Sequence, residues 1–314
     1  MTRRILVYHP EPADTRAYAD LIRLPSRSWS VTAALTPGAA IAAAPEAEIL
    51  YCWRPPRELL AGATRLRWIQ CMGAGVEQLL VPEVSPRVAI TRVAGIFGPW
   101  IAEYALGWCL WVTQRMDGFR ASQRARRWAP IDPIPLRGQT LCVIGLGDIG
   151  ARIARTGRAL GLRVLGVSRS GRAVTGVERV YRPRTLPAVL RLADFVVLTL
   201  PLSAATRGLL GPPALAAMKP SAWLINVARG PIVDEAALID ALRARRIGGA
   251  VLDVFDLEPL PAEHPLWTLD NVVITPHISG PSTPREIAPI FADNLRRYLA
   301  GRPLRHAVDR RRGY

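Results

Sequence analysis

Lysine is almost absent from this chain of 314 residues: Lys219 is the only one, and the other basic residues are arginines. The chain also lacks an uninterrupted apolar run long enough to span a bilayer, so we expect no membrane-embedded segment. Its first residues, 1–8, predict a strand and do not have the form of a signal peptide. Since the cysteines show no metal-ligand spacing, we expect no metal site and buried, reduced thiols in a cytoplasmic protein. The four cysteines are Cys52, Cys71, Cys109 and Cys142.

The formal net charge of +16 is large, but it is spread along the chain. Proteins that bind nucleic acid usually gather their positive charge on one face or in one stripe. The arginine clusters here are short, at 124–127, 243–246 and 310–312. We therefore expect solvated helix faces and no specific nucleic-acid partner. The same charge can raise the rate at which small anionic substrates reach the protein.

Three polar residues in the second half of the chain each end a stretch that is typical of a strand. Arg229, Glu258 and His277 close or follow apolar runs, which cover residues 223–230, 250–257 and 272–277. In an open parallel sheet, ligands bind outside the carboxyl ends of the strands, so these strands would bring the three side chains to one crevice. A cation can hold an anionic substrate, an imidazole can transfer a proton near neutral pH, and a carboxylate can orient the imidazole.

A glycine-rich turn follows the apolar run 141–144, with glycines at Gly145, Gly147 and Gly150. A helix is expected next and then another strand, at 151–160 and 163–167. Strand, Gly-x-Gly-x-x-Gly turn, helix and strand in this order are typical of a dinucleotide-binding fold. Gly145 would allow the tight turn, Gly147 would let a pyrophosphate approach the backbone, and Gly150 would let helix and strand pack closely. The phosphates would face free N–H groups at the helix N-terminus.

The length allows two domains, each with its own core. Strands are expected at 3–8, 48–53, 66–70 and 88–92, with helical stretches between them. A long apolar helix is expected at about 99–116, a projecting basic arm or loop at 115–135, and a final helix at about 284–300. We thus predict a discontinuous substrate domain, 1–99 with 281–314, and a dinucleotide-binding domain, 100–280, that includes a dimerisation helix and arm at about 99–136.

Further motifs occur in an order that resembles a known family. They are Gly-Ala-Gly-Val-Glu at 73–77, the glycine turn at 145–150, Leu-Pro-Leu-Ser-Ala-Ala-Thr-Arg-Gly at 200–208, Asn-Val-Ala-Arg-Gly at 226–230, Leu-Asp-Val-Phe-Asp-Leu-Glu-Pro-Leu at 252–260 and Thr-Pro-His at 275–277. Over nearly the whole chain these motifs resemble the D-isomer-specific 2-hydroxyacid dehydrogenases. Within that family the chain looks most like the glyoxylate/hydroxypyruvate reductases of the bacterial A type, from residues 8–10, 53–56 and 308–314. The resemblance implies an α/β fold with two Rossmann-like, doubly wound parallel-sheet domains and an active-site cleft between them.

The family reaction is reversible hydride transfer between a nicotinamide and C2 of a 2-oxo acid. The resemblance makes His277 the general acid that protonates the carbonyl oxygen during reduction. Glu258 would hydrogen-bond His277 and keep it protonated near neutral pH. Arg229 would bridge the carboxylate and the carbonyl oxygen of the substrate and polarise the carbonyl for hydride attack.

The resemblance also assigns substrate contacts to the first domain. The N–H groups of Ala74 and Gly75, in the turn that starts at Gly73, would hold the substrate carboxylate. Trp53 would wall the pocket, although packing is an equal alternative in a chain with nine tryptophans. Ser279 could contact a substrate hydroxyl. Closure of the two domains would exclude water from the hydride path.

The choice of cofactor depends on the end of the second strand in the nucleotide fold. NAD-specific members place a carboxylate there, where it binds the ribose hydroxyls, but residues 166–172 contain none. Ser168 and Arg169, with Arg172 in reach, would hold a 2′-phosphate, so we expect NADP(H) in preference to NAD(H). Asp253 would assist at the nicotinamide end or cap a strand. Other cofactor contacts are expected from Leu146, Asp148, Ile149, Ser170, Leu200, Pro201, Val227, Ala228, Arg229, His277, Ser279 and Gly280.

Alternatives stay open at this point. The small anionic substrate could be glyoxylate or hydroxypyruvate, a bulkier 2-oxo acid, or a phosphorylated serine-pathway compound, and the lack of an added C-terminal regulatory domain weakens the last option. A non-catalytic dinucleotide-sensing protein is a different class, but it would not need to keep the cation, carboxylate and imidazole together. Because the long helix and the arm resemble the family's dimer-forming region, we expect a two-fold homodimer.

Overall fold

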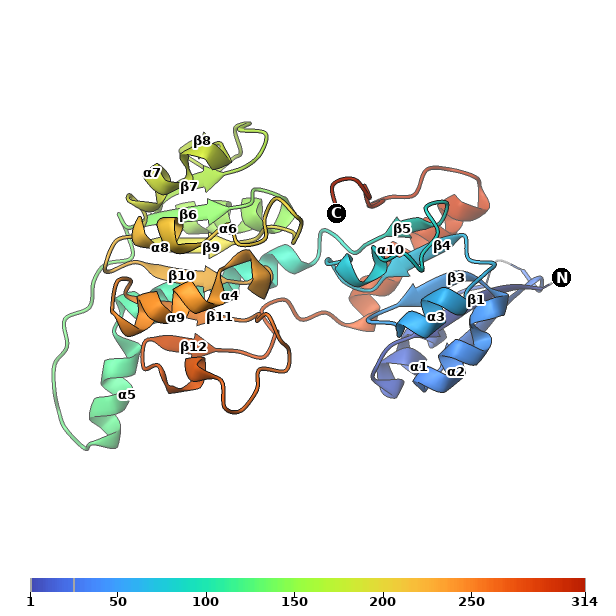
Figure 1. Ribbon diagram of the computed structural model, residues 1–314, viewed down its shortest axis with the longest axis horizontal. Coiled ribbons are helices and arrows are strands. Elements are labelled where there is room, and N and C mark those ends of the chain that lie inside the picture. Colours follow the sequence, from blue (N-terminus) through green and yellow to red (C-terminus); the bar gives the residue numbers. More distant parts are fainter. Residues whose placement is uncertain (1, 25, 314) are drawn as a thin grey trace. The chain divides into compact units, whose positions relative to one another are not determined.

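The computed structural model describes residues 2–24 and 26–313 (Figure 1). The chain divides into two units. Unit 1 combines the described residues up to Ile96 with those from Ser282 onward, and unit 2 covers Phe97–Pro281. The domain boundary expected after residue 99 lies inside a helix of unit 2, which begins at Phe97.

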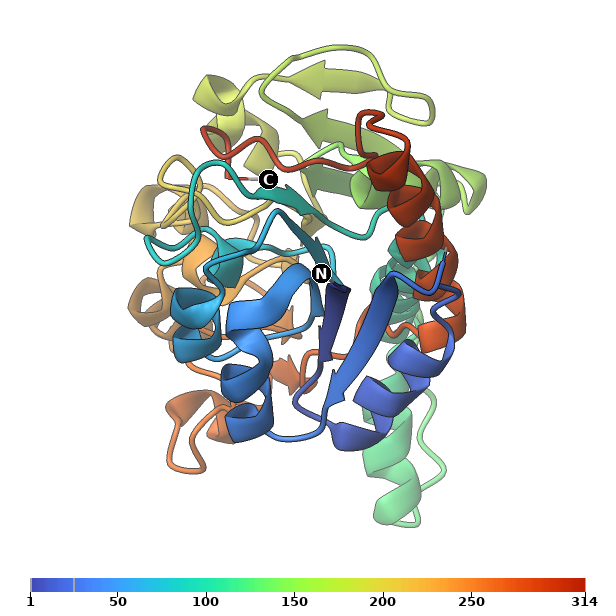
Figure 2. The same cartoon turned by 90° about the vertical axis from the view of Figure 1, so that its right-hand side faces the viewer.

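Unit 1 is built on five parallel strands in the order β2-β1-β3-β4-β5. The strands are β1 (Arg3–Tyr8), β2 (Trp29–Ala34), β3 (Ala47–Cys52), β4 (Trp68–Cys71) and β5 (Ala89–Thr91). Figure 2 shows α1 (Pro12–Asp20) and α10 (Pro284–Leu299) on one face, with α2 (Pro37–Ala43) and α3 (Arg57–Gly62) on the other. Since helices cover both faces, the central strands are nearly continuous apolar runs rather than alternating ones.

Helix α10 joins the C-terminal part of the chain to the sheet of unit 1. The ring of Phe291 stacks on Tyr51, with 4.3 Å between the ring centroids. The buried side chain of Asn294 donates a hydrogen bond to Gln70, with 3.1 Å between Nδ2 and Oε1. These contacts place an apolar face of α10 on the sheet and satisfy the polar groups that lie under it.

Strand β2 was not expected, because the sequence predicted only helical stretches between strands 3–8 and 48–53. Its sequence, Trp-Ser-Val-Thr-Ala-Ala, neither alternates nor forms a continuous apolar run. Most of its residues are partly exposed, as is usual at a sheet edge. The strand is defined by its pairing with β1 over the full length of both, from Arg3 opposite Trp29 to Tyr8 opposite Ala34. Such pairing is a tertiary contact that local sequence does not encode.

Unit 2 is built on seven parallel strands in the order β12-β11-β10-β9-β6-β7-β8 (Figure 1). They are β6 (Thr140–Ile144), β7 (Arg163–Val167), β8 (Arg179–Tyr181), β9 (Phe195–Leu198), β10 (Trp223–Asn226), β11 (Gly249–Leu252) and β12 (Val272–Ile274). Helices α4 (Phe97–Thr113) and α6 (Asp148–Ala159) pack together on one face, and α7 (Leu186–Leu190), α8 (Pro212–Ala216) and α9 (Glu235–Arg243) lie on the other. The two parallel-sheet units confirm the predicted fold class.

The strand order of unit 2 reverses at β6. From β6 the chain runs outward to β7 and β8, and then crosses to β9 on the other side of β6. Ligands of open α/β sheets bind at the carboxyl ends of the strands beside such a reversal. The glycine turn directly follows β6, so it lies at the position that this rule predicts.

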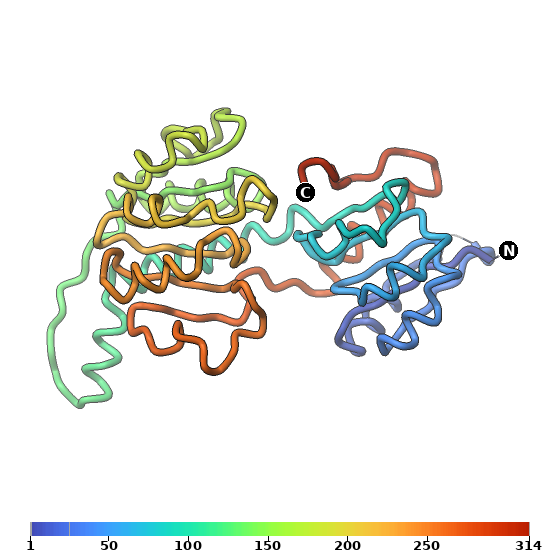
Figure 3. Tube along the Cα trace, in the orientation of Figure 1, coloured from blue at the N-terminus to red at the C-terminus, as the bar shows by residue number. Residues whose placement is uncertain are grey.

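The predicted arm at 115–135 contains a helix, α5 (Met116–Arg124), which the sequence analysis did not predict. Gln114 and Arg115 separate α5 from α4, and Arg115 has a backbone φ of 54°, in the left-handed region. The chain after α5 makes an open excursion before it enters β6, as the tube in Figure 3 shows. Short 3-10 helices occur at Ala44–Glu46, Glu77–Leu79, Pro183–Thr185, Gly230–Ile232 and Pro265–Thr268. Among residues 2–24 and 26–313, no helix has both the length and the apolar character needed to cross a bilayer.

Candidate active site

Arg229, Glu258 and His277 follow three neighbouring strands of unit 2. β10, β11 and β12 are adjacent and parallel in the sheet. Arg229 follows β10, Glu258 follows β11 and His277 follows β12. Because the strands are parallel, all three residues emerge at the same, carboxyl edge of the sheet, as the sequence predicted.

His277 and Glu258 form a hydrogen-bonded pair. Nδ1 of His277 lies 2.8 Å from Oε2 of Glu258. The other carboxylate oxygen of Glu258 accepts a hydrogen bond from the backbone N–H of Phe255, at 3.1 Å. About a third of the His277 side chain is exposed (34%). The carboxylate therefore occupies Nδ1 and leaves Nε2 as the nitrogen that can exchange a proton with a substrate.

Arg229 is partly buried and has an extended backbone at the end of β10. Its guanidinium donates a hydrogen bond to the carbonyl of Ala228, with 2.6 Å between Nη1 and the oxygen. The side chain of Asn226, which is 1% exposed, accepts from the N–H of Ala228 and donates to the carbonyl of Arg229, at 3.1 Å in both cases. Sequence reasoning missed this role of Asn226, although a buried amide at the end of an apolar strand is a usable signal for such a clamp.

Asp253 is completely buried, and its carboxylate holds the segment that carries His277. It accepts hydrogen bonds from the backbone N–H groups of Ile278, at 2.8 Å, and Ser279, at 2.9 Å. The sequence left two roles open for Asp253, and the structure shows that it fastens the loop after β12. Ser279 is also buried, at 6% exposure.

The glycine turn has the geometry that its three glycines predict. Gly145 has a φ of 101°, in the left-handed region that favours glycine. A Cβ on Gly150 would collide with the carbonyl oxygen of Gly145, whereas a Cβ on Gly147 would meet nothing within 4 Å. Helix α6 begins at Asp148, one turn earlier than expected, with Gly147 at its N-cap. The close approach at Gly150 and the open space at Gly147 fit a pyrophosphate over the helix N-terminus.

The other expected cofactor residues lie around this turn or on the loops that follow neighbouring strands. Leu146 packs against Gly166 of β7. Thr199, at the end of β9, donates a hydrogen bond to the carbonyl of Gly145, with 2.6 Å between the oxygens. That contact fixes the start of the segment with Leu200 and Pro201, which are partly buried. The remaining expected residues are Asp148 and Ile149 in the first turn of α6, Val227 and Ala228 after β10, and Gly280 after β12.

The segment after β7 offers hydroxyl and N–H groups. Ser168 Oγ accepts a hydrogen bond from the N–H of Gly171, at 3.2 Å, and Ser170 Oγ accepts from the N–H of Arg172, at 3.3 Å. Arg169 and Arg172 are exposed. The side chain of Arg182, the residue after β8, lies over Gly171. A Cβ built on Gly171 would be 3.2 Å from Nε of Arg182. Sequence reasoning missed Arg182, which the pairing of β7 with β8 brings to this place.

In unit 1, Trp53 lies directly over the turn that starts at Gly73. A Cβ on Gly73 would collide with the indole ring of Trp53. Cys71 holds the turn by donating from its sulfur to the carbonyl of Gly75, at 3.3 Å. In the part of the chain that the structure describes, the N–H groups of Ala74 and Gly75 make no hydrogen bond to protein. Such N–H groups in a turn can bind an anion.

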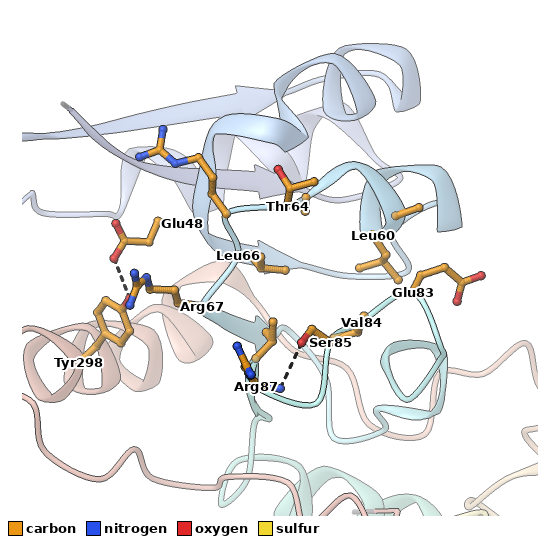
Figure 4. Close-up of a pocket in the computed structure, with 14 residues that line it drawn as sticks. Glu48, Leu60, Thr64, Leu66, Arg67, Glu83, Val84, Ser85, Arg87 and Tyr298 are labelled. Carbon is orange, nitrogen blue, oxygen red and sulfur yellow. Dashed lines mark hydrogen bonds between the residues drawn. The ribbon is translucent and has the colours of Figure 1, made fainter.

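A separate hollow of about 880 Å³ lies at the opposite, amino edge of the unit 1 sheet (Figure 4). Glu48, Arg67 and Val88, which stand near the amino ends of β3, β4 and β5, line it together with Tyr298. None of its lining residues is one of the expected site residues. The hollow is therefore distinct from the candidate site in unit 1.

Comparison with protein families decides the assignment. Residues 106–279 match the family model described as the D-isomer specific 2-hydroxyacid dehydrogenase, NAD binding domain. The chain belongs to this dehydrogenase family. It is accordingly an oxidoreductase whose unit 2 contains a nicotinamide dinucleotide-binding domain.

Individual members of the 2-hydroxyacid dehydrogenase family resemble the chain over most of its length. Glyoxylate/hydroxypyruvate reductase A of Escherichia fergusonii is 34% identical over 275 residues, which are 85% of this chain and 88% of the relative. A family protein from Aeromonas salmonicida is 38% identical, with a TM-score of 0.91 over 99% of this chain and 100% of its own. An NADPH-dependent glyoxylate/hydroxypyruvate reductase from Sinorhizobium meliloti, solved with NADP and sulfate, is 27% identical, with a TM-score of 0.89 and all of both chains covered.

Proposed function

We propose that this dehydrogenase reduces a small 2-oxo acid, glyoxylate or hydroxypyruvate, to the 2-hydroxy acid with NADPH. The observation that carries the proposal is the hydrogen-bonded pair of His277 and Glu258, which follow β12 and β11, while Arg229 follows the adjacent strand β10. An imidazole paired with a carboxylate is suited to proton transfer, and a neighbouring guanidinium is suited to a carboxylate substrate. The names of the relatives support the same reaction.

In the proposed reaction a bound nicotinamide supplies the hydride, and the protein binds the substrate and supplies the proton. Arg229 binds the substrate carboxylate and carbonyl oxygen, and its charge stabilises the negative charge that develops on that oxygen. His277 gives the proton from Nε2 to the same oxygen. Glu258 holds the imidazole by Nδ1 and offsets the positive charge of its protonated form. We further propose that the N–H groups of Ala74 and Gly75 bind the substrate carboxylate.

The preference for NADP(H) over NAD(H) is part of the proposal. The segment after β7 presents Ser168, Ser170 and exposed arginines, and no carboxylate stands in residues 166–172. Besides Arg169 and Arg172 of this segment, Arg182 adds a third guanidinium, because its side chain lies next to Gly171. A 2′-phosphate would bind such donors strongly, whereas ribose hydroxyls would miss their usual acceptor.

We propose that the protein acts as a homodimer through α5 and the segment that follows it. Trp128 is fully exposed and Phe119 is 41% exposed, and exposed aromatic side chains that lie close together in a protein often mark an interaction surface. A partner copy would cover them. A cytoplasmic location is also proposed, because Cys52 and Cys71 lie opposite each other on β3 and β4 as buried thiols and form no disulfide, in keeping with a reducing compartment.

The test is the oxidation of NADPH, followed by its absorbance, with glyoxylate and with hydroxypyruvate, repeated with NADH and with His277→Ala. We expect turnover with NADPH, weaker turnover with NADH, and loss of turnover in the variant. Tight binding of NADPH without turnover of either acid would contradict the proposed substrates. Equal turnover with NADH and NADPH would contradict the proposed cofactor preference but not the proposed reaction.

A further inference from the structure

The loop after β12, residues 275–280, which we call the histidine loop, is held on both sides of His277 by one buried residue. Besides the N–H groups of Ile278 and Ser279, the carboxylate of Asp253 accepts a hydrogen bond from the hydroxyl of Thr275, with 2.6 Å between Oγ1 and Oδ1. The backbone carbonyl of Asp253 also accepts from the N–H of His277, at 2.9 Å. The position of His277 therefore depends on where Asp253 and Thr275 stand.

Helix α4 adds a further hydroxyl to this network. Oη of Tyr104 lies 2.6 Å from Oγ1 of Thr275. A threonine hydroxyl has one proton, and an ionised carboxylate only accepts hydrogen bonds. Since Thr275 donates to Asp253, it must accept from Tyr104, which fixes the direction of the chain from Tyr104 through Thr275 to Asp253. Burial raises the pKa of Tyr104 to about 12, so its hydroxyl keeps the proton that it donates.

The backbone of the histidine loop needs such support. His277 has a φ of 55°, in the left-handed region that residues other than glycine rarely adopt. Such a conformation persists only where the surrounding contacts enforce it. At the far end of the loop, Gly280 packs against α4, since a Cβ there would lie 3.0 Å from Cδ1 of Ile101. Helix α4 thus contacts the loop at both ends, through Tyr104 and through Ile101.

We propose that Tyr104 and Thr275 are positioning residues for His277, and that their paired hydroxyls hold the histidine loop in the geometry needed for proton transfer. They touch neither substrate nor cofactor in this proposal, and they act through the carboxylate of Asp253. The inference rests on the function proposed above. Its consequence is selective: proton transfer suffers when the loop relaxes, because displacements of about 1 Å can slow a reaction strongly, whereas cofactor binding at the glycine turn is spared.

The first experiment compares Thr275→Val, Thr275→Ser, Tyr104→Phe and wild type in glyoxylate reduction with NADPH. Thr275→Val removes the hydroxyl at constant shape, and we expect kcat to fall about tenfold or more while KM for NADPH stays within about twofold. Tyr104→Phe should lower kcat about threefold, because Thr275 still reaches Asp253. Thr275→Ser restores the hydroxyl and should return kcat to within about threefold of wild type. Thr268→Val, which removes a hydroxyl that donates a hydrogen bond to the carbonyl of Pro265, is the matched control and should not change kcat.

The second experiment does not depend on activity. Hydrogen exchange of the Ile278 and Ser279 amides should be faster in Thr275→Val and Tyr104→Phe than in wild type, and unchanged in Thr268→Val. Unchanged exchange and unchanged kcat in both variants would overturn the inference, as would an equal loss of kcat in Thr275→Ser and Thr275→Val. If Thr275→Val does not fold, the kcat and the amide exchange of Tyr104→Phe decide whether the inference holds. A wild-type protein without reductase activity would contradict the proposed function, and the exchange data would still judge the positioning role.

Discussion

Glu258 divides its carboxylate between two partners: Oε2 lies 2.8 Å from Nδ1 of His277, and Oε1 accepts a hydrogen bond from the backbone N–H of Phe255 at 3.1 Å. The second bond orients the carboxylate within its own loop. The first selects the imidazole form with a proton on Nδ1 and leaves Nε2 for the substrate. Glu258, which follows β11, thereby holds the partly exposed imidazole of His277, which follows β12.

Glu258→Gln should keep the shape of this contact and remove its charge. We expect kcat/KM for glyoxylate to fall about 10- to 100-fold, as is usual when a residue that orients a catalytic imidazole is changed. His277→Ala should lower it by about 10²- to 10⁴-fold, the usual contribution of a general acid. The Kd of NADPH, measured by fluorescence titration, should change little in either variant.

The matched control for Glu258→Gln is Glu235→Gln. Glu235 pairs with His264 at 3.1 Å, so the same chemical change is made at a second histidine–glutamate pair. Equal losses of kcat/KM in the two variants would mean that Glu258 acts through the stability of the protein and not through His277.

Arg229→Lys should lower kcat/KM by about 10- to 100-fold. Lysine keeps the charge but loses the planar fork that can bind two oxygens of the substrate at once. The measurement is steady-state kinetics with glyoxylate at saturating NADPH. Arg243→Lys, a change at an exposed position in the last turn of α9, is the control and should leave the kinetics as in wild type. Full activity of Arg229→Lys would show that a single positive charge is enough to bind the substrate and that the planar fork of arginine is not needed.

Arg169→Ala and Arg182→Ala should raise KM for NADPH by about tenfold or more each, because a charged hydrogen bond to a phosphate contributes about 1.5–3 kcal/mol. KM for NADH should stay nearly constant, since NADH has no 2′-phosphate. Arg158→Ala, on an exposed position of α6, controls for the loss of positive charge alone. A parallel rise of KM for both cofactors would show that these side chains do not read the 2′-phosphate.

The stability of the protein in acid should depend on Glu48. Its carboxylate accepts hydrogen bonds from Arg3 at 2.9 Å and from Tyr298 at 2.7 Å. The bond from Arg3 holds the pKa of Glu48 below its ordinary value of 4.5. A lowered folded-state pKa stabilises the fold above the unfolded pKa, and this contribution is lost as pH falls through the folded pKa.

Glu48→Gln should therefore have a lower Tm than wild type at pH 7, and the difference should shrink as the pH falls below about 4.5. Thermal unfolding followed by circular dichroism over this pH range is the measurement. Glu46→Gln is the control, because Glu46 pairs with Arg4 at the surface and is 61% exposed. If the Tm difference does not change with pH, the loss of stability in Glu48→Gln comes from altered packing and not from the charge of Glu48.

Phe119→Ser should weaken the proposed dimer, because it removes an exposed aromatic side chain from α5. Sedimentation at decreasing protein concentration should show monomers of the variant where wild type is still dimeric. Leu160→Ser, at an exposed position beyond the end of α6, is the matched control. A wild-type protein that is monomeric at micromolar concentration would end the proposal.

Local sequence was sufficient for the features that depend on short-range chemistry. The glycine turn was predicted because the left-handed φ of Gly145 and the close contact at Gly150 exclude other residues. The strands before Arg229, Glu258 and His277 were predicted because each is a short, uninterrupted apolar run. The rule that parallel strands end at one edge then predicted that the three residues lie at the same, carboxyl edge of the sheet.

The tertiary structure alone decided the features that depend on partners distant in the sequence. β2 exists through its pairing with β1, and Arg182 reaches the segment after β7 through the pairing of β7 with β8. The hydroxyl chain from Tyr104 to Thr275 joins residues 171 positions apart, and neither side chain has a local pattern that predicts it. Backbone periodicity and turn chemistry are local and can be read from neighbouring residues, whereas a hydrogen bond between two elements depends on how the sheet and its helices pack.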